Sequence, residues 1–378
     1  MRLATILAWG LTSLAIMPVE AQSPWRVEPT PVLDVTGLTA AGVVAFGTVN
    51  WATRFPSGVI AVADAGGPAL QYFDAKGAFI KSIGRGGAGP GDFRTVTWVA
   101  RCAPDTAFAL DFALGRITTF DEAGTMGRSF SVGTSGGAQI ASACNVGGRF
   151  VLFGRGRRLP PPSPPDPAAA YFIIHTVSPL QLVDGSGQVA ATIGEVPSGE
   201  MVGGMNGRGG GGMPRPLGQT TTFALSADRL FVGTGDSATV DVYSLTGERL
   251  RTIRLDVPAR TPTKAQYESA AGVFLSIVPS GMRESARNWV LSIPMPQRLP
   301  PYSALLSDDS GLLWVVLSVP GDANTRLRAV RETGAVVADV TVPLNLAVFE
   351  IGADYILGGR EDAGGEPHLL MFRLHRGR

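Results

Sequence analysis

One unit of three short apolar runs recurs along this chain and limits the folds open to it. In its clearest copy, residues 57–84, the runs cover 58–64, 69–74 and 78–83, with a turn at 75–77 before the last run. Each run has the length and composition of a β-strand. Further copies follow at 106–132, 149–193, 229–253 and 312–340. The chain is therefore built from repeats of one antiparallel meander.

Further strand candidates lie between these units, at 95–100, 220–224 and 302–307. A four-stranded sheet leaves both of its faces uncovered, and packing such sheets radially around a channel buries them. The last unit, 345–374, has only three runs, so we expect residues 31–36 to pair with it as a fourth strand. The sequence thus predicts an all-β fold: a six-bladed β-propeller with four-stranded antiparallel blades.

Several stretches resemble known propellers. Residues 77–93, GAFIKSIGRGGAGPGDF, are similar to the blade junction of NHL-repeat proteins. The C-terminal third resembles a family of exported bacterial six-bladed propellers of unassigned function. The matching segments are LPPY at 299–302, DDxGxLWV at 308–315, GADYILG at 352–358 and FRLHR at 372–376. These are structural positions, so the resemblance implies a fold and leaves the activity open.

The first 21 residues have the pattern of an export signal. Arg2 is followed by a nearly all-apolar run at 3–17 and by Ala21, a small residue that suits a signal peptidase. We expect a mature chain, 22–378, that forms one propeller domain in the periplasm or outside the cell. No second run of about 18 apolar residues follows, so no membrane span is expected. The net charge of +1 gives no reason to expect nucleic acid as a partner.

Three insertions interrupt the repeat. The first, 155–167, is rich in proline, and a partner could grip it in an extended conformation, although a stiff solvated loop is the favoured interpretation. The second, 199–218, is rich in glycine and is expected to be flexible. The third, 258–293, is predicted to be helical.

This third insertion has apolar residues at helical spacing between Tyr267 and Ile277, and Pro262 suits the first turn of a helix. The sequence Pro-Ser-Gly at 279–281 then precedes a second expected helix around 283–291. We expect the pair to pack on its own domain across one end of the propeller, where it restricts access to the channel. A partner-binding or mobile lid helix is the alternative.

The only cysteines, Cys102 and Cys144, lie six residues before Phe108 and Phe150 in consecutive repeats. They therefore occupy equivalent places in neighbouring blades. Export to an oxidising compartment favours a disulfide between them. Two buried thiols are the alternative.

Residues 84–89 satisfy the dinucleotide-binding pattern G-x-G-x-x-G. That pattern works by opening a helix whose N-terminus faces a pyrophosphate, whereas Pro90 and the β-rich segment 95–98 predict no helix. We interpret these glycines as a tight crossing from one blade to the next.

Candidates for a metal site are few. Asp64 and Asp111 end equivalent strands, and a ring of such carboxylates near a channel mouth could bind Ca²⁺. The ring is incomplete, and the favoured interpretation is that each aspartate hydrogen-bonds the backbone of its turn. The histidines, His175, His368 and His375, show no metal-ligand spacing. We assign no catalytic residue and no cofactor from the sequence.

Two functions remain as the main hypotheses, and a purely structural role is a third possibility. The leading one is an exported, monomeric scaffold whose loops bind a protein, peptide or glycan without catalysis. The alternative is a metal-assisted hydrolase or lyase, similar in outline to regucalcin-like lactonases, with carboxylate ligands in the central channel. Propellers host both activities, so the fold does not decide between them.

Overall fold

The structure is a computed structural model. It describes residues 24–37, 46–64, 66–67, 69–132, 140–154, 156–160, 171–204, 213–276, 278 and 280–377, with the backbone alone at 140–142 and 276. The expected signal segment and the centres of the first two insertions lie outside the described residues.

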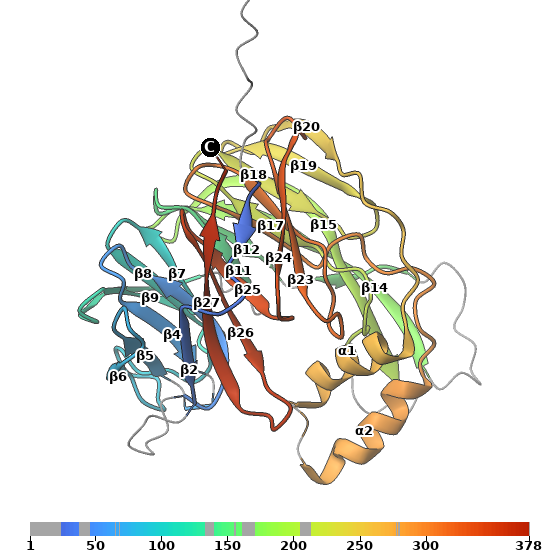
Figure 1. The fold of residues 1–378 in the computed structure, drawn as a ribbon, viewed down its shortest axis with the longest axis horizontal. Helices are drawn as coiled ribbons and strands as arrows, with labels where there is room; N and C mark the ends of the chain where they lie inside the picture. Colours follow the sequence, from blue (N-terminus) through green and yellow to red (C-terminus); the bar gives the residue numbers. More distant parts are fainter. Residues whose placement is uncertain are drawn as a thin grey trace, which may run out of the picture.

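In the described residues, six antiparallel sheets make up the fold (Figure 1). In four of them, four consecutive strands pair in chain order. One sheet consists of β3 (Val49–Arg54), β4 (Ile60–Asp64), β5 (Ala69–Phe73) and β6 (Phe79–Ile83). The next consists of β7 (Val96–Ala103), β8 (Thr106–Asp111), β9 (Arg116–Asp121) and β10 (Met126–Ser131). A third consists of β17 (Thr222–Leu225), β18 (Arg229–Gly233), β19 (Thr239–Ser244) and β20 (Arg249–Arg254). A fourth consists of β21 (Ala304–Ser307), β22 (Leu313–Val316), β23 (Thr325–Val330) and β24 (Val336–Val342).

The sheet between the second and third of these contains a long hairpin. Its strands are β11 (Ile140–Cys144), β12 (Phe150–Phe153), β14 (Tyr171–Val183) and β15 (Val189–Gly204), with the short β13 (Arg157–Arg158) and β16 (Met213–Pro214) at its margins. The sequence predicts strands only at 180–184 and 188–193 here. Pairing continues further, to Tyr171 opposite Gly204, because the far end of the hairpin has a helical layer to pack against.

The last sheet joins the two ends of the described chain. Its consecutive strands are β25 (Ala347–Ile351), β26 (Tyr355–Glu361) and β27 (Pro367–His375). Two N-terminal strands, β1 (Arg26–Val27) and β2 (Leu33–Thr36), both pair with β27 in antiparallel fashion. Leu33 lies opposite Met371 and Thr36 opposite His368. In Figure 1 the blue β2 accordingly runs beside the red β27.

The sheets close into a ring. The inner strands β3, β7, β11, β17, β21 and β25 each contact the next, and β25 contacts β3. The main hydrophobic clusters lie between neighbouring sheets; Trp314 and Phe372, for example, are fully buried between the last two. Radial packing of this kind buries both faces of each sheet. The structure confirms the all-β propeller that the sequence predicts.

Two helices, α1 (Lys264–Ser276) and α2 (Ser280–Ser292), form the third insertion. Thr263 caps α1: its hydroxyl accepts the Gln266 N–H at 3.2 Å, and Oε1 of Gln266 accepts the Thr263 N–H at 2.8 Å. Pro262 therefore lies before the cap and outside the first turn. The second helix begins three residues earlier than predicted.

The helices pack on the end of the long hairpin, where Val202 and Met213 share a cluster with Ala271 and Val290. In Figure 1 they lie at one edge of the molecule. Within the described residues, no helix is both long enough and apolar enough to span a membrane.

Candidate functional site at the channel mouth

A cavity of about 140 Å³ lies at one end of the channel. It is lined by the later residues of the inner strands and by the turns that follow them, such as 145–146 after β11, 226–227 after β17 and 308–309 after β21. This is therefore the end of the channel at which the inner strands finish. Neither helix contributes a lining residue, so the described cavity does not show the restriction that we expected from the helical insertion.

Five aromatic side chains line this cavity. We call four of them the aromatic floor: Trp51, Trp98, Phe223 and Phe349. The rings of Trp51 and Phe349 lie 5.4 Å apart between centroids. Trp51 is half-buried, whereas the other three are buried. The floor therefore contributes apolar surface to the cavity.

Polar side chains follow the aromatic ones along the same strands. Arg101 comes three residues after Trp98, Glu350 comes directly after Phe349, and Asp308 and Asp309 follow β21. We call these four residues the polar rim. Since the inner strands end at the mouth, the rim lies closer to the mouth than the floor does.

The Glu350 carboxyl is held by three neighbouring groups. Its carboxylate accepts hydrogen bonds from the hydroxyls of Thr53 and Tyr355 and from the Arg54 N–H, the last at 3.2 Å. Burial raises the pKa of the Glu350 carboxyl, although these hydrogen bonds and the charge of Arg101 act in the opposite direction. Burial also raises the pKa of Tyr355, and the adjacent Glu350 adds to that rise. Tyr355 therefore stays a neutral hydrogen-bond donor.

Arg101 links three sheets at the mouth. Its Nη2 lies 2.9 Å from Oδ2 of Asp309, and its backbone N–H donates to the Thr53 hydroxyl at 3.1 Å. The same hydroxyl donates to Glu350. Arg101, Asp309 and Glu350 thus belong to one network of polar contacts.

Asp308 is held from several sides. It accepts a hydrogen bond from Nε1 of Trp314 at 2.8 Å and forms an ion pair with Nη2 of Arg376 at 2.7 Å. The Arg376 guanidinium also lies over the rings of Trp25 and Trp314. The C-terminal segment therefore fixes one side of the mouth.

A disulfide links Cys102 and Cys144, with their Cα atoms 5.4 Å apart. It joins the neighbouring inner strands β7 and β11 at the end where the cavity lies, and Cys144 lines the cavity itself. This covalent link constrains two adjacent walls of the mouth.

The structure does not bring Asp64 and Asp111 together as metal ligands. Oδ1 of Asp64 accepts the Thr48 N–H at 3.0 Å, and Oδ2 of Asp111 accepts the Arg94 N–H at 2.7 Å. Both carboxylates therefore bind the backbone that leads into the inner strand of their own sheet. Neither residue lines the cavity.

The glycine-rich segment 84–93 connects β6 to β7 as a loop, with no helix. Gly84 and Gly91 have φ angles of 85° and 76°, a region that favours glycine. A Cβ atom on Gly84 would lie 2.6 Å from the Phe93 ring. The dinucleotide-binding pattern thus lacks the helix that it requires.

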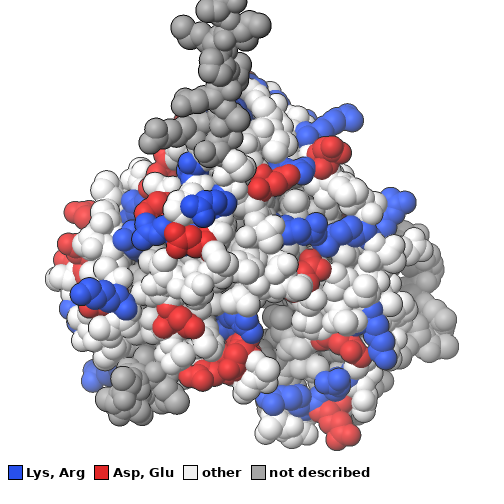
Figure 2. All heavy atoms as spheres, viewed as in Figure 1, with Lys and Arg blue, Asp and Glu red and all other residues white. Residues whose placement is uncertain are grey.

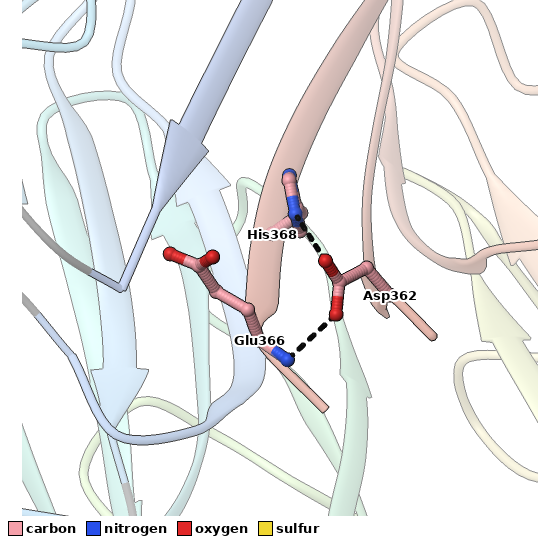
Figure 3. Close-up of side chains that lie close together, drawn as sticks. All are labelled: Asp362, Glu366 and His368. Atoms are coloured by element: carbon pink, nitrogen blue, oxygen red, sulfur yellow. Dashed lines mark hydrogen bonds and ion pairs between the residues drawn. The ribbon is translucent and has the colours of Figure 1, made fainter. Parts of the chain in front are cut away.

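In the described part of the chain, one group of side chains gathers enough ligand atoms for a metal ion: Asp362, Glu366 and His368, with atoms within 4.8 Å of one another. They lie at the turn between β26 and β27 (Figure 3), outside the cavity. This group was not predicted from the sequence, because it contains neither paired histidines nor the pattern H-x-E. The reversed order, E-x-H at 366–368 with an aspartate across a turn, was the available signal.

No protein-family model and no curated protein matches the chain. Among solved structures, it is similar to a putative exported protein from Bacteroides fragilis, at 10% identity and a TM-score of 0.47, over 96% of this chain and 98% of that one. It is similar to a member of the DUF4221 family from Bacteroides vulgatus, at 11% identity and a TM-score of 0.49, over 94% and 100%. It also resembles a streptogramin B lyase, at 9% identity and a TM-score of 0.44, over 90% and 97%. Likeness at this level concerns the fold, so the function must be argued from the residues of the site.

Proposed function

We propose that this protein is an exported, monomeric scaffold that holds one group of a peptide, protein or glycan partner in the mouth of its channel, without catalysis. The observation that carries the proposal is the combination of the aromatic floor and the polar rim in one small cavity. A cavity of about 150 Å³ accommodates roughly one aromatic ring. The mouth therefore suits a single side chain or sugar ring of a larger partner.

The charges at the rim favour an uncharged group. Arg101 is paired with Asp309, Asp308 is paired with Arg376, and burial raises the pKa of Glu350. The rim thus presents hydrogen-bonding groups with little net charge. A neutral sugar or an aromatic side chain fits such a surface better than a phosphate or a free carboxylate.

The same pairings argue against a hydrolytic role for the cavity. Its carboxyl groups are bound to neighbouring side chains or backbone amides, and the group suited to a cation lies elsewhere. The export signal at 1–21 and the disulfide support an oxidising compartment. Six NHL-like blades in one domain, 22–378, are part of this proposal.

The test blocks the mouth with a side chain. Ala227 is exposed and lines the cavity, whereas Ala335 is exposed on an outer turn of another sheet. Binding of neutral oligosaccharides and aromatic peptides to the wild type, Ala227→Phe and Ala335→Phe would be measured by calorimetry. We expect at least a tenfold loss of affinity in Ala227→Phe alone.

Mass spectrometry of the same mixtures reports on catalysis. Unchanged ligands are expected after long incubation. Turnover of a ligand that Ala227→Phe abolishes would replace the scaffold proposal with an enzymatic one. Binding that is equal in all three proteins, or no binding by the wild type, would overturn the mouth as the binding site.

A further inference from the structure

We propose that Asp362, Glu366 and His368 form a binding site for a zinc-type divalent cation, with Asp34 as the outer partner of the histidine. This site lies on the hairpin turn of the last sheet, and Asp34 belongs to the N-terminal strand β2. The inference is independent of the function proposed for the channel mouth.

The first ligand, Asp362, is held in place by its own turn. Its Oδ1 accepts the N–H groups of Gly364 and Glu366, at 2.8 and 2.9 Å. Its Oδ2 remains to face His368.

The gap between Asp362 and His368 fits an ion. Oδ2 of Asp362 lies 3.9 Å from Nε2 of His368, which is too long for a hydrogen bond. In a tetrahedral zinc site, two ligand atoms at bond lengths of about 2.0 Å from the ion lie about 3.3 Å apart. A closure of about 0.6 Å would therefore bring both atoms into contact with one ion.

The strongest observation comes from outside this group. Oδ1 of Asp34 lies 2.8 Å from Nδ1 of His368. A carboxylate that accepts the Nδ1–H of a histidine fixes the tautomer whose lone pair is on Nε2. Metal-binding histidines are held by outer carboxylates in this way. The ring is also mostly buried, with 18% of its side chain exposed.

Glu366 supplies the third ligand. It lies two residues before His368, so both side chains project from the same face of the chain as it enters β27. In the described part of the chain, the Glu366 carboxylate has no ion pair that would compete for it. Three protein ligands and a water complete a four-coordinate zinc site, and an imidazole ligand favours zinc over calcium.

His375, which lies in the same strand β27, provides a matched control. Nε2 of His375 lies 2.8 Å from Oε1 of Glu28, so this pair also joins β27 to the N-terminal segment. The guanidinium of Arg373 lies 4.0 Å from the same carboxylate, which disfavours a cation there. The two pairs thus share a structural setting and differ in their suitability for a metal.

The experiment uses the untagged, oxidised protein after treatment with a chelator. Zinc chloride alone is titrated by calorimetry into the wild type, His368→Gln, Glu366→Gln, Asp34→Asn and His375→Gln. We expect one zinc per wild-type chain. His368→Gln and Glu366→Gln should each weaken zinc affinity at least tenfold, and loss of the outer partner in Asp34→Asn by about 10- to 100-fold. The zinc affinity of His375→Gln should stay within about twofold of the wild-type value.

Thermal unfolding of each variant without zinc controls for folding, and Glu366→Gln keeps the test valid if the histidine variant fails to fold. Calcium chloride should not displace the zinc. No saturable binding to the wild type, or binding that Glu366→Gln and His368→Gln leave unchanged, would overturn the site. Tighter binding of calcium than of zinc would overturn the assigned class of ion.

Discussion

Arg101 and Asp309 form an ion pair that spans the mouth of the channel, with 2.9 Å between Nη2 and Oδ2. Their strands, β7 and β21, stand three places apart in the ring of six inner strands, so the pair joins opposite sides of the ring. The Arg101 side chain is 15% exposed, and that of Asp309 is 68% exposed. We call this ion pair, which crosses the end of the ring where the cavity lies, the bar.

Replacing Asp309 with Asn should open the mouth at little cost to folding. Because the Asp309 carboxylate is mostly exposed, its ion pair with Arg101 should contribute only about 1 kcal/mol to the free energy of unfolding. Without its partner, Arg101 is free to move, so acrylamide should quench the fluorescence of the tryptophans in the floor more strongly. Fluorescence quenching and urea unfolding measure the two effects.

The control for that variant is Asp339→Asn, which breaks the exposed pair with Arg328 on the outer strands of the sheet that contains β21. Its quenching should match that of the wild type. Equal quenching in Asp309→Asn and Asp339→Asn would show that the bar does not limit access.

Glu350 should make the stability of the protein depend on pH. Burial raises its pKa, so the folded protein holds this proton more tightly than the unfolded chain does. The stabilisation from this group is therefore present at low pH and is lost as pH rises from about the usual value of 4.5 through the folded pKa. Glu350→Gln does not titrate, so its stability relative to the wild type should increase over this range.

Urea unfolding of the wild type and of Glu350→Gln between about pH 4 and 8 tests this. Each unit of difference in pKa corresponds to about 1.4 kcal/mol. If the two proteins differ in their free energy of unfolding by the same amount across the range, folding does not change the pKa of Glu350.

The strands and helices could be predicted from the sequence because their signals are local. The alternating runs of 58–64 and 69–74 lie in β4 and β5, and the apolar spacing from Tyr267 onward lies in α1. Boundaries were less accurate: β14 begins at Tyr171, nine residues before the predicted strand, since its pairing depends on helices that come later in the chain.

The candidate site could not be predicted in the same way. Arg101 and Asp309 are 208 residues apart, and Asp34 and His368 are 334 apart. Each pair meets only after the ring has closed, so no local pattern marks it. Asp64 and Asp111 illustrate the reverse case: their repeated position is visible in the sequence, but it reflects hydrogen bonds to the backbone within each sheet.

Removal of the disulfide should destabilise the protein and loosen the mouth. The bridge spans 42 residues, and closing a loop of this length contributes up to about 4 kcal/mol to the free energy of unfolding. The double variant Cys102→Ala and Cys144→Ala should therefore unfold at a lower urea concentration than the oxidised wild type. The reduced wild type should behave like the double variant. Identical unfolding of the oxidised wild type and the variant would contradict a stabilising bridge.

The attachment of α1 depends on Asp322, which follows β22. Oδ1 of Asp322 accepts a hydrogen bond from Nε2 of Gln266 in α1 at 2.6 Å, and Oδ2 accepts one from Nη1 of Arg260 at 3.2 Å. Burial alone would raise the pKa of Asp322, but hydrogen bonds from the Val319 N–H, Gln266 and Arg260 outweigh it and hold the pKa below its usual value.

Asp322→Asn should therefore release the helix. Amide hydrogen exchange over 264–276 should become several-fold faster at neutral pH, because a neutral side chain binds Arg260 and Gln266 more weakly. A lowered pKa stabilises the folded state above the unfolded value of 3.8 and ceases to do so as pH falls through the folded pKa. The wild type and Asp322→Asn should therefore have similar free energies of unfolding in acid. Glu284→Gln, on the exposed side of α2, is the control, and its amide hydrogens should exchange at the wild-type rate. If α1 in Asp322→Asn is as well protected from exchange as α1 in the wild type, the apolar contacts with the hairpin hold the helix by themselves.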